Sequence, residues 1–152
     1  MQVTIAAVGR DRTGAHRALY ELYCRRCPWR IGLVEVPLPS VADVARRRAM
    51  EAARLARAVA GAEAVVALDE GGAPLGSEAF AATIGSWREQ GLSRIGFLIG
   101  GPDGLDPEGL PPLDLRLAFG PMTWPHQLVR VMLAEQLYRA STILAGHPYH
   151  RG

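Results

Sequence analysis

Short apolar runs alternate with segments of helical periodicity along the whole chain, and this alternation limits the possible folds more than any other feature. Strand-type runs occur at residues 3–8, 31–38, 64–68, 95–99 and 115–119. Runs that are apolar on both faces are typical of strands in a parallel sheet that helices cover on both sides. The order predicts an α/β fold with a mostly parallel sheet flanked by helices.

Four helices are expected between and after these runs. Helical spacing of apolar residues predicts the first three at residues 15–24, 41–60 and 77–90. Ser40 and Ser77 are the predicted N-caps of the second and third helices. The last helix opens at residues 123–125, where a proline is tolerated in the first turn. The proline-rich residues 107–112 predict a loop with at most one helical turn.

Length and charge exclude several classes of protein. The 152 residues suit one domain, residues 1–152, and all 17 basic residues are arginine. Without lysine the chain has neither a Schiff-base lysine nor a P-loop. A net charge of +2 is too small to indicate a nucleic-acid binder by itself. We expect a cytoplasmic protein without membrane contact, because no apolar run approaches about 20 residues and the first residues form a strand instead of a signal peptide.

Two groups of residues resemble parts of metal sites, but neither is complete. Cys24 and Cys27 have the spacing of half a zinc site or a redox pair. No second cysteine pair exists, and a helix C-terminus opposes thiolate formation. His147 and His150 could chelate a metal together with His126, but no cluster of carboxylates or thiolates accompanies them. We therefore expect no metal.

Glycine-rich loops follow three of the predicted strands, at residues 68–72, 100–104 and 120–125. Ligands of open α/β sheets bind beyond the carboxyl ends of the strands, and glycines let the backbone approach a ligand closely. Each loop taken alone is better explained as a tight turn, so the signal lies in the three loops together. None has the G-x-G-x-x-G pattern, so a dinucleotide site is not supported.

The last helix and the tail after it contain most of the side chains that could take part in catalysis. Helical geometry places His126 and Arg130 together, and Glu135 and Arg139 on nearly the opposite side, where they form a structural or a catalytic pair. Apolar residues cover most of the rest, so the helix should be buried in a core or against another chain. Proton-transferring groups are concentrated in residues 147–151, which predicts that the tail belongs to an active site.

Four motifs together closely resemble the RlmH family, which are pseudouridine N3-methyltransferases of the large ribosomal subunit within the SPOUT class. The motifs are Leu98-Ile-Gly-Gly-Pro-Asp-Gly104, Thr123-Trp-Pro-His-Gln-Leu-Val-Arg130, Leu133-Ala-Glu-Gln-Leu-Tyr-Arg-Ala140 and His147-Pro-Tyr-His-Arg151. The resemblance covers essentially the whole chain, and the combination of motifs is very specific. It implies a C-terminal deep trefoil knot, a homodimer, and methylation of a pseudouridine in 23S rRNA on the assembled ribosome.

The resemblance also implies the residues of the site. S-adenosyl-L-methionine would bind in the knot, and the partner subunit would complete the substrate site. The cofactor residues would be Leu68, Gly101, Phe119, Gly120, Pro121, Met122, Thr123 and Trp124. The catalytic residues facing the RNA would be Arg139, Tyr149, His150 and Arg151.

The chemistry of methylation leaves the individual roles open. Transfer from a sulfonium is an in-line displacement, and N3 of pseudouridine must first lose its proton. His150 or Tyr149 could assist proton removal, and Arg139 or Arg151 could stabilise negative charge on a carbonyl oxygen. Tyr149 or Trp124 could instead stack an extruded base. The alternatives to this function are a knotted methyltransferase for another RNA and a non-catalytic module that binds ribosomes or RNA.

Overall fold

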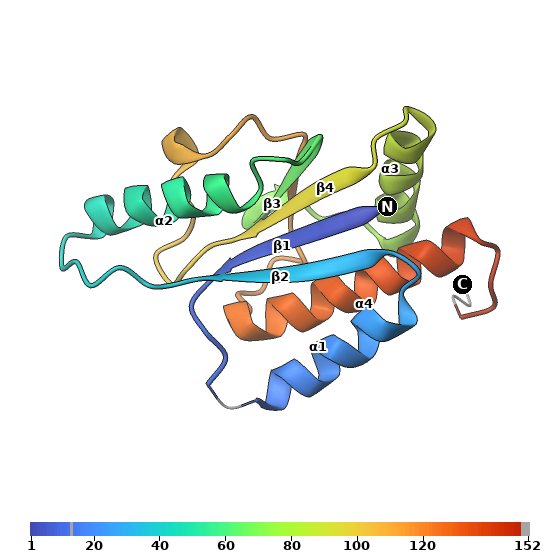
Figure 1. Ribbon diagram of the computed structural model, residues 1–152, viewed down its shortest axis with the longest axis horizontal. Helices are drawn as coiled ribbons and strands as arrows, with labels where there is room; N and C mark the ends of the chain where they lie inside the picture. Colours follow the sequence, from blue (N-terminus) through green and yellow to red (C-terminus); the bar gives the residue numbers. More distant parts are fainter. Residues whose placement is uncertain (13, 150–152) are drawn as a thin grey trace.

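The structure, a computed structural model that describes residues 1–12 and 14–149, is built around a five-stranded sheet (Figure 1). The strands are β1 (Gln2–Val8), β2 (Arg30–Val36), β3 (Ala64–Ala73), β4 (Arg94–Ile99) and β5 (Leu115–Leu117). Their order in the sheet is β2-β1-β4-β3-β5, and every pairing is parallel. The prediction of an α/β fold with a parallel sheet is confirmed.

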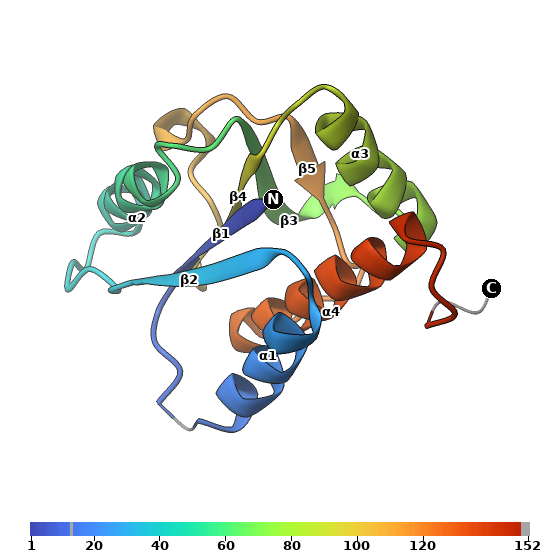
Figure 2. The ribbon, with the colours of Figure 1, turned by 45° about the vertical axis from the view of Figure 1, so that its right-hand side comes forward.

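Helices cover both faces of this sheet. The helices are α1 (Ala15–Arg26), α2 (Val44–Ala58), α3 (Ser77–Glu89) and α4 (His126–Leu144), with one 3-10 turn at Pro107–Gly109. Helix α2 lies on one face, and α4 lies between α1 and α3 on the other (Figure 2). The single turn within residues 107–112 is as predicted.

The residues of β1 alternate between two hydrophobic cores. Ile5 and Ala7 belong to the larger core, which α1, α3 and α4 cover, whereas Ala6 and Val8 belong to the smaller core under α2. Successive side chains of a strand point to opposite faces, so a strand between two helical layers must be apolar at nearly every position. This is why the strands read as continuous apolar runs.

The predicted N-cap of α2 was wrong. The helix begins at Val44, and the Asp43 carboxylate accepts a 2.7 Å hydrogen bond from the Arg46 backbone N–H. Ser40 lies three residues too early to reach the first free N–H groups. Asp and Ser are comparable N-caps, so the apolar pattern alone could not choose between them.

The start of α3 also differs from prediction. Gly76 occupies the N-cap position, and Ser77 is the first helical residue. The Ser77 hydroxyl donates to Gln136 Oε1 at 2.8 Å instead of capping the helix. This bond ties α3 to α4, a long-range contact that local sequence does not reveal.

Strand β3 is longer than the apolar run predicted, because it continues through residues 69–73 to a second pairing with β5. A Cβ added at Gly72 would lie 2.7 Å from the Arg116 carbonyl carbon, so a side chain has no room there. One of the predicted glycine loops is therefore a strand extension in which glycine permits close backbone approach.

Helix α4 is buried as predicted, in the core between α1 and α3. Leu133, Ala134 and Leu137 have no exposed surface. Among the described residues, no helix has both the length and the apolar character that crossing a membrane requires. The deep trefoil knot stays a prediction.

Candidate functional site

A cavity of about 460 Å³ opens where the C-terminal ends of β3, β4 and β5 meet the start of α4. Seven of the eight predicted cofactor residues line it: Leu68, Gly101, Phe119, Gly120, Met122, Thr123 and Trp124. The eighth, Pro121, is exposed and does not line the cavity. Residues up to 56 positions apart in sequence (68 to 124) are thus brought together at the edge of the sheet where α/β proteins bind ligands.

The loop after β4 forms one wall as a tight turn. The Gly104 N–H donates to the Gly101 carbonyl oxygen at 3.1 Å, and Gly104 has a φ of +78°. A Cβ at Gly101 would lie 2.9 Å from Glu51 Oε2 and 3.1 Å from Val8 Cγ1. The turn therefore brings bare backbone to the cavity at a position where a side chain would collide with the layer behind.

Residues 119–124 form a second wall, which two side-chain hydrogen bonds hold in place. The Trp124 indole N–H donates to the Phe119 carbonyl oxygen at 3.2 Å. The Thr123 hydroxyl donates to Glu70 Oε2 at 3.1 Å. Gly120 has a φ of +97°, in the left-handed region that favours glycine. This wall offers backbone groups and aromatic surface to a ligand.

The charged groups in the cavity wall are acidic. Asp69, Glu70 and Asp103 line the cavity, and no arginine is among its lining residues in the described part of the chain. A hydrogen bond from Arg116 holds the pKa of Asp69 below its usual value, so this carboxylate stays ionised near neutral pH. Arg116 and Arg47 pair with Asp69 and Asp103, so Glu70 is the carboxylate of this wall without an ion pair among the described residues, and it favours a cation over phosphate.

His126 lines the same cavity at the start of α4. Burial, followed by the nearby charge of Arg130, lowers the pKa of its imidazole. The ring is therefore neutral at pH 7 and adds no positive charge to the cavity.

The tail residues gather around Glu135, towards the other end of α4. Glu135 Oε1 accepts hydrogen bonds from Arg139 Nε at 3.0 Å, from Arg139 Nη2 at 2.5 Å and from the Tyr149 hydroxyl at 3.2 Å. The guanidinium carbon of Arg139 lies 4.9 Å from the centre of the Tyr149 ring. Tyr138 packs on the same ring, with the two centres 4.6 Å apart. The predicted Glu135–Arg139 pair exists and holds Tyr149 in place.

The electrostatics of this cluster bear on the role of Tyr149. Burial, and then the charge of Glu135, raise the pKa of the Tyr149 phenol above its ordinary value. The hydrogen bond to Glu135 also raises the pKa of Arg139, which stays charged. A phenol that keeps its proton is a poor general base, whereas its ring remains available for stacking.

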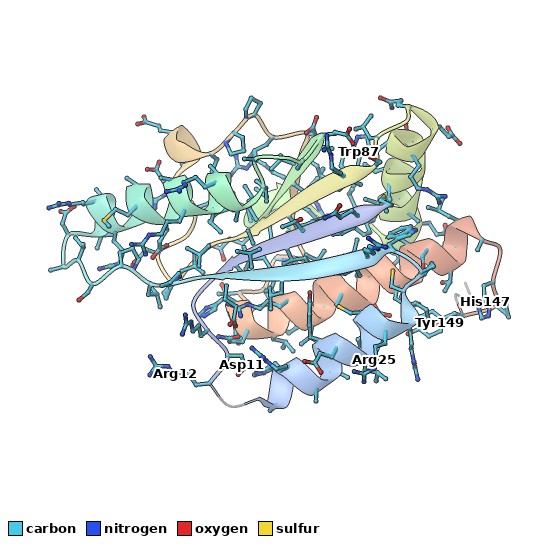
Figure 3. All side chains as sticks on the ribbon, in the orientation of Figure 1. Asp11, Arg12, Arg25, Trp87, His147 and Tyr149 are labelled. Atoms are coloured by element: carbon cyan, nitrogen blue, oxygen red, sulfur yellow. The ribbon has the colours of Figure 1, made fainter. Side chains whose placement is uncertain are left out.

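The cavity and the tail cluster lie far apart within one chain. Ten positions on α4 separate Val129, which lines the cavity, from Arg139, which corresponds to about 15 Å at about 1.5 Å per residue. His147 and Tyr149, labelled in Figure 3, follow the helix in sequence, and Tyr149 packs beside residues 135–139 of α4. The other two predicted catalytic residues, His150 and Arg151, lie outside the described residues.

The hypotheses of a metal site and of a redox-active cysteine pair gain no support from the described residues. Within residues 1–12 and 14–149, no three His, Cys, Asp or Glu side chains are grouped as a metal site requires. His126 and His147 lie at opposite ends of α4. Burial raises the pKa of both thiols, Cys24 and Cys27, which disfavours the thiolates that redox or metal chemistry needs.

A smaller cavity of about 240 Å³ lies between α1, β2 and α4, and the charged side chain of Arg130 in its wall stabilises the fold. Arg130, only 3% exposed, donates to the carbonyl oxygens of Val8 and Gly9 at 2.8 Å each and to Glu35 Oε1 at 3.0 Å. These bonds fix the start of α4 to the end of β1. Arg130 thereby positions the helix turn that carries His126 into the larger cavity.

Comparison with known proteins identifies the family. A family profile described as predicted SPOUT methyltransferase matches residues 1–150. The chain belongs to the SPOUT methyltransferase family.

Relatives within this SPOUT methyltransferase family match over nearly their full length. A protein of Rhodospirillum centenum named ribosomal RNA large subunit methyltransferase H is 52% identical over 151 residues, which cover 99% of both chains. Proteins with the same name from Bradyrhizobium diazoefficiens and Brucella anthropi are each 46% identical over 159 residues, covering 99% of both chains. A solved structure described as a probable methylase family protein from Haemophilus influenzae has a TM-score of 0.58 at 12% identity, covering 99% of this chain and 70% of the other, which shows the shared fold.

The sequence predictions did not assign the carboxylates of the cavity. Asp69 and Glu70 follow directly after the apolar run of residues 64–68, and Asp103 lies in the glycine loop after β4, and these positions were the available signal. Glu51 and Arg47 on α2 were also missed, although Arg47 Nη2 pairs with Asp103 at 2.7 Å. Their role depends on α2 packing against the glycine loop, which no local pattern predicts.

Proposed function

We propose that the protein is an S-adenosyl-L-methionine-dependent methyltransferase that methylates N3 of a pseudouridine in 23S rRNA on the assembled ribosome. The observation that carries the proposal is the cavity at the carboxyl ends of β3, β4 and β5, which has carboxylates and no arginine among its described lining residues, within a SPOUT methyltransferase. The relatives' name supports rRNA as the substrate class. We place the enzyme in the cytoplasm, where ribosomes are, as a single domain spanning residues 1–152.

The cavity residues suit this cofactor. A volume of about 460 Å³ lies within the usual range of small-molecule sites. When bound, S-adenosyl-L-methionine supplies an electrophilic methyl group on a cationic sulfur. Leu68 and Phe119 offer apolar surface to the adenosine, and the backbone of residues 119–124 offers hydrogen bonds. Glu70, which has no ion pair among the described residues, favours the positive charges of the sulfonium and ammonium groups.

A homodimer supplies the remainder of the site. The tail cluster of Arg139 and Tyr149 is about 15 Å along α4 from Val129, the nearest residue of that helix in the cavity wall of its own chain. Side chains of α4 that are only partly covered, including Leu128, Met132 and Gln136, leave one side of the helix for a second copy. We infer that two chains pack so that the tail of each faces the cavity of the other.

The tail residues then bind and prepare the nucleotide. Arg139, held by Glu135, stabilises the negative charge on a carbonyl oxygen of the pseudouridine as N3 loses its proton. Tyr149 offers its ring for stacking, because its phenol stays protonated. His150 is the candidate proton acceptor, and Arg151 adds positive charge towards the RNA.

Transfer of labelled methyl from S-adenosyl-L-methionine to RNA tests the proposal. The acceptors are ribosomes lacking this modification, isolated large subunits and naked 23S rRNA. We expect label at one pseudouridine of 23S rRNA, with the fastest transfer to assembled ribosomes. Transfer to a different RNA would indicate a SPOUT methyltransferase with another substrate. Absence of both transfer and cofactor binding would contradict the enzyme proposal and favour a ribosome-binding module.

A further inference from the structure

Glu51 on α2 is a buried charged residue that the proposed chemistry does not use. Its exposed fraction is 2%, and neither carboxylate oxygen has a hydrogen bond of normal geometry to any described residue. Arg130, also buried, instead donates three hydrogen bonds, to the carbonyl oxygens of Val8 and Gly9 and to Glu35. Burying an unpaired carboxylate is strongly unfavourable unless another group compensates for its charge, so the burial of Glu51 needs an explanation.

The Glu51 carboxylate lies directly behind the cavity wall. A Cβ built on Gly101 would lie 2.9 Å from Oε2 and 3.3 Å from Oε1 of Glu51, and Gly101 itself lines the cavity. A single glycine backbone therefore separates this carboxylate from the space that a ligand would fill. Its negative charge acts across a thin, poorly screening layer of protein.

Neighbouring charges do not satisfy Glu51. Arg47, one turn earlier on α2, pairs with Asp103 through Nε at 2.8 Å and Nη2 at 2.7 Å. Burial, and then the charge of Asp103, raise the pKa of Glu51, while Arg47, the Gly101 backbone and Arg54 lower it. A cation placed in the cavity would supply the missing compensation and favour the ionised carboxylate.

We propose that Glu51 is a specificity-determining residue that makes the cavity favour a sulfonium methyl donor over the neutral thioether left after transfer. The inference rests on the proposed function. Transfer breaks the sulfur–methyl bond, forms the N3–methyl bond and leaves the bonding electron pair on sulfur, which loses its charge. The attraction to Glu51 falls at that moment. S-adenosylhomocysteine is thereby bound more weakly, and its release becomes easier.

Binding measurements on variants of the full-length protein test this role. Calorimetry gives the Kd of S-adenosylmethionine and of S-adenosylhomocysteine, and the ratio of the second to the first measures selectivity. The variants are Glu51→Gln, of equal shape, and Glu51→Met, of similar length. Glu89→Gln is the matched control, because it removes the same charge from an exposed residue at the end of α3, at the opposite end of the strands from the cavity.

We expect selectivity to fall about tenfold in both Glu51 variants and to stay unchanged in the control, the size expected for one buried charge near another. A purely structural role would weaken the binding of both compounds alike. Equal changes in the two Kd values, no change in either, or failure of both variants to fold would overturn the inference. Failure of the unaltered protein to bind either compound would instead overturn the proposed function, and the inference with it.

Discussion

At the scale of single residues, Gly101 is the most constrained position of the cavity. Its backbone forms the wall in front of Glu51, and a Cβ there would approach Glu51 Oε2 to 2.9 Å and Val8 Cγ1 to 3.1 Å. The oxygen is the end of a side chain, but Glu51 is buried and Val8 has no exposed surface. The turn would have to move into the cavity to make room.

Replacing Gly101 by Ala should therefore weaken cofactor binding more than folding. We expect the Kd of S-adenosylmethionine to rise at least about tenfold, with a loss of about 1–3 kcal/mol in the free energy of unfolding from overpacking. Calorimetry and denaturant unfolding measure the two effects. The control is Gly61→Ala, because nothing lies within 4 Å of a Cβ at Gly61. Unaltered affinity in the Gly101 variant would contradict the placement of the cofactor.

Individual residues also show how much of the candidate site could be predicted from the sequence alone. Gly101 and Trp124 were assigned through the family resemblance, and the structure places both on one cavity. Glu51 was not assigned, because an acidic residue in an Ala/Arg helix looks like part of a solvated face. Its burial depends on α2 packing over the β4 loop, a contact between residues 50 positions apart (51 and 101).

At the scale of elements, the strands were easier to predict than the helix ends. Each buried strand is apolar on both faces, which fixes its position within a few residues. Helix ends depend on which nearby polar side chain reaches the free N–H groups, and α2 offered both Ser40 and Asp43. Strand β3 extends beyond its apolar run because Gly72 lets β5 approach, which is a tertiary effect.

The cap of α2 gives a prediction at this scale. Asp43→Ala removes the acceptor for the Arg46 N–H and should lower the free energy of unfolding by about 1 kcal/mol. Ser40→Ala, the residue that the sequence pattern favoured, should change it by less than about 0.5 kcal/mol. Urea unfolding followed by circular dichroism measures both. A larger loss in the Ser40 variant would contradict the observed helix start.

At the scale of the whole molecule, the two halves of the proposed site would belong to different copies of the chain. The cavity lies at the N-terminal end of α4, and the Arg139–Tyr149 cluster lies farther along the helix, about 15 Å from Val129 to Arg139. The family resemblance implied that the partner subunit completes the site, whereas helical periodicity alone gave no sign of it. The homodimer and the knot stay predictions, since one chain carries no partner.

Mixing two inactive variants tests the composite site most directly. One variant, Gly101→Ala, has a defective cavity and an intact tail, and the other, Arg139→Ala, has the reverse. Each should transfer almost no methyl to ribosomes at a limiting cofactor concentration. After unfolding and refolding together in equal amounts, half of the dimers are mixed and each mixed dimer has one intact site, so activity should return to about a quarter of the unaltered protein's. No recovery, with mixed dimers shown to form, would contradict a site shared between two chains.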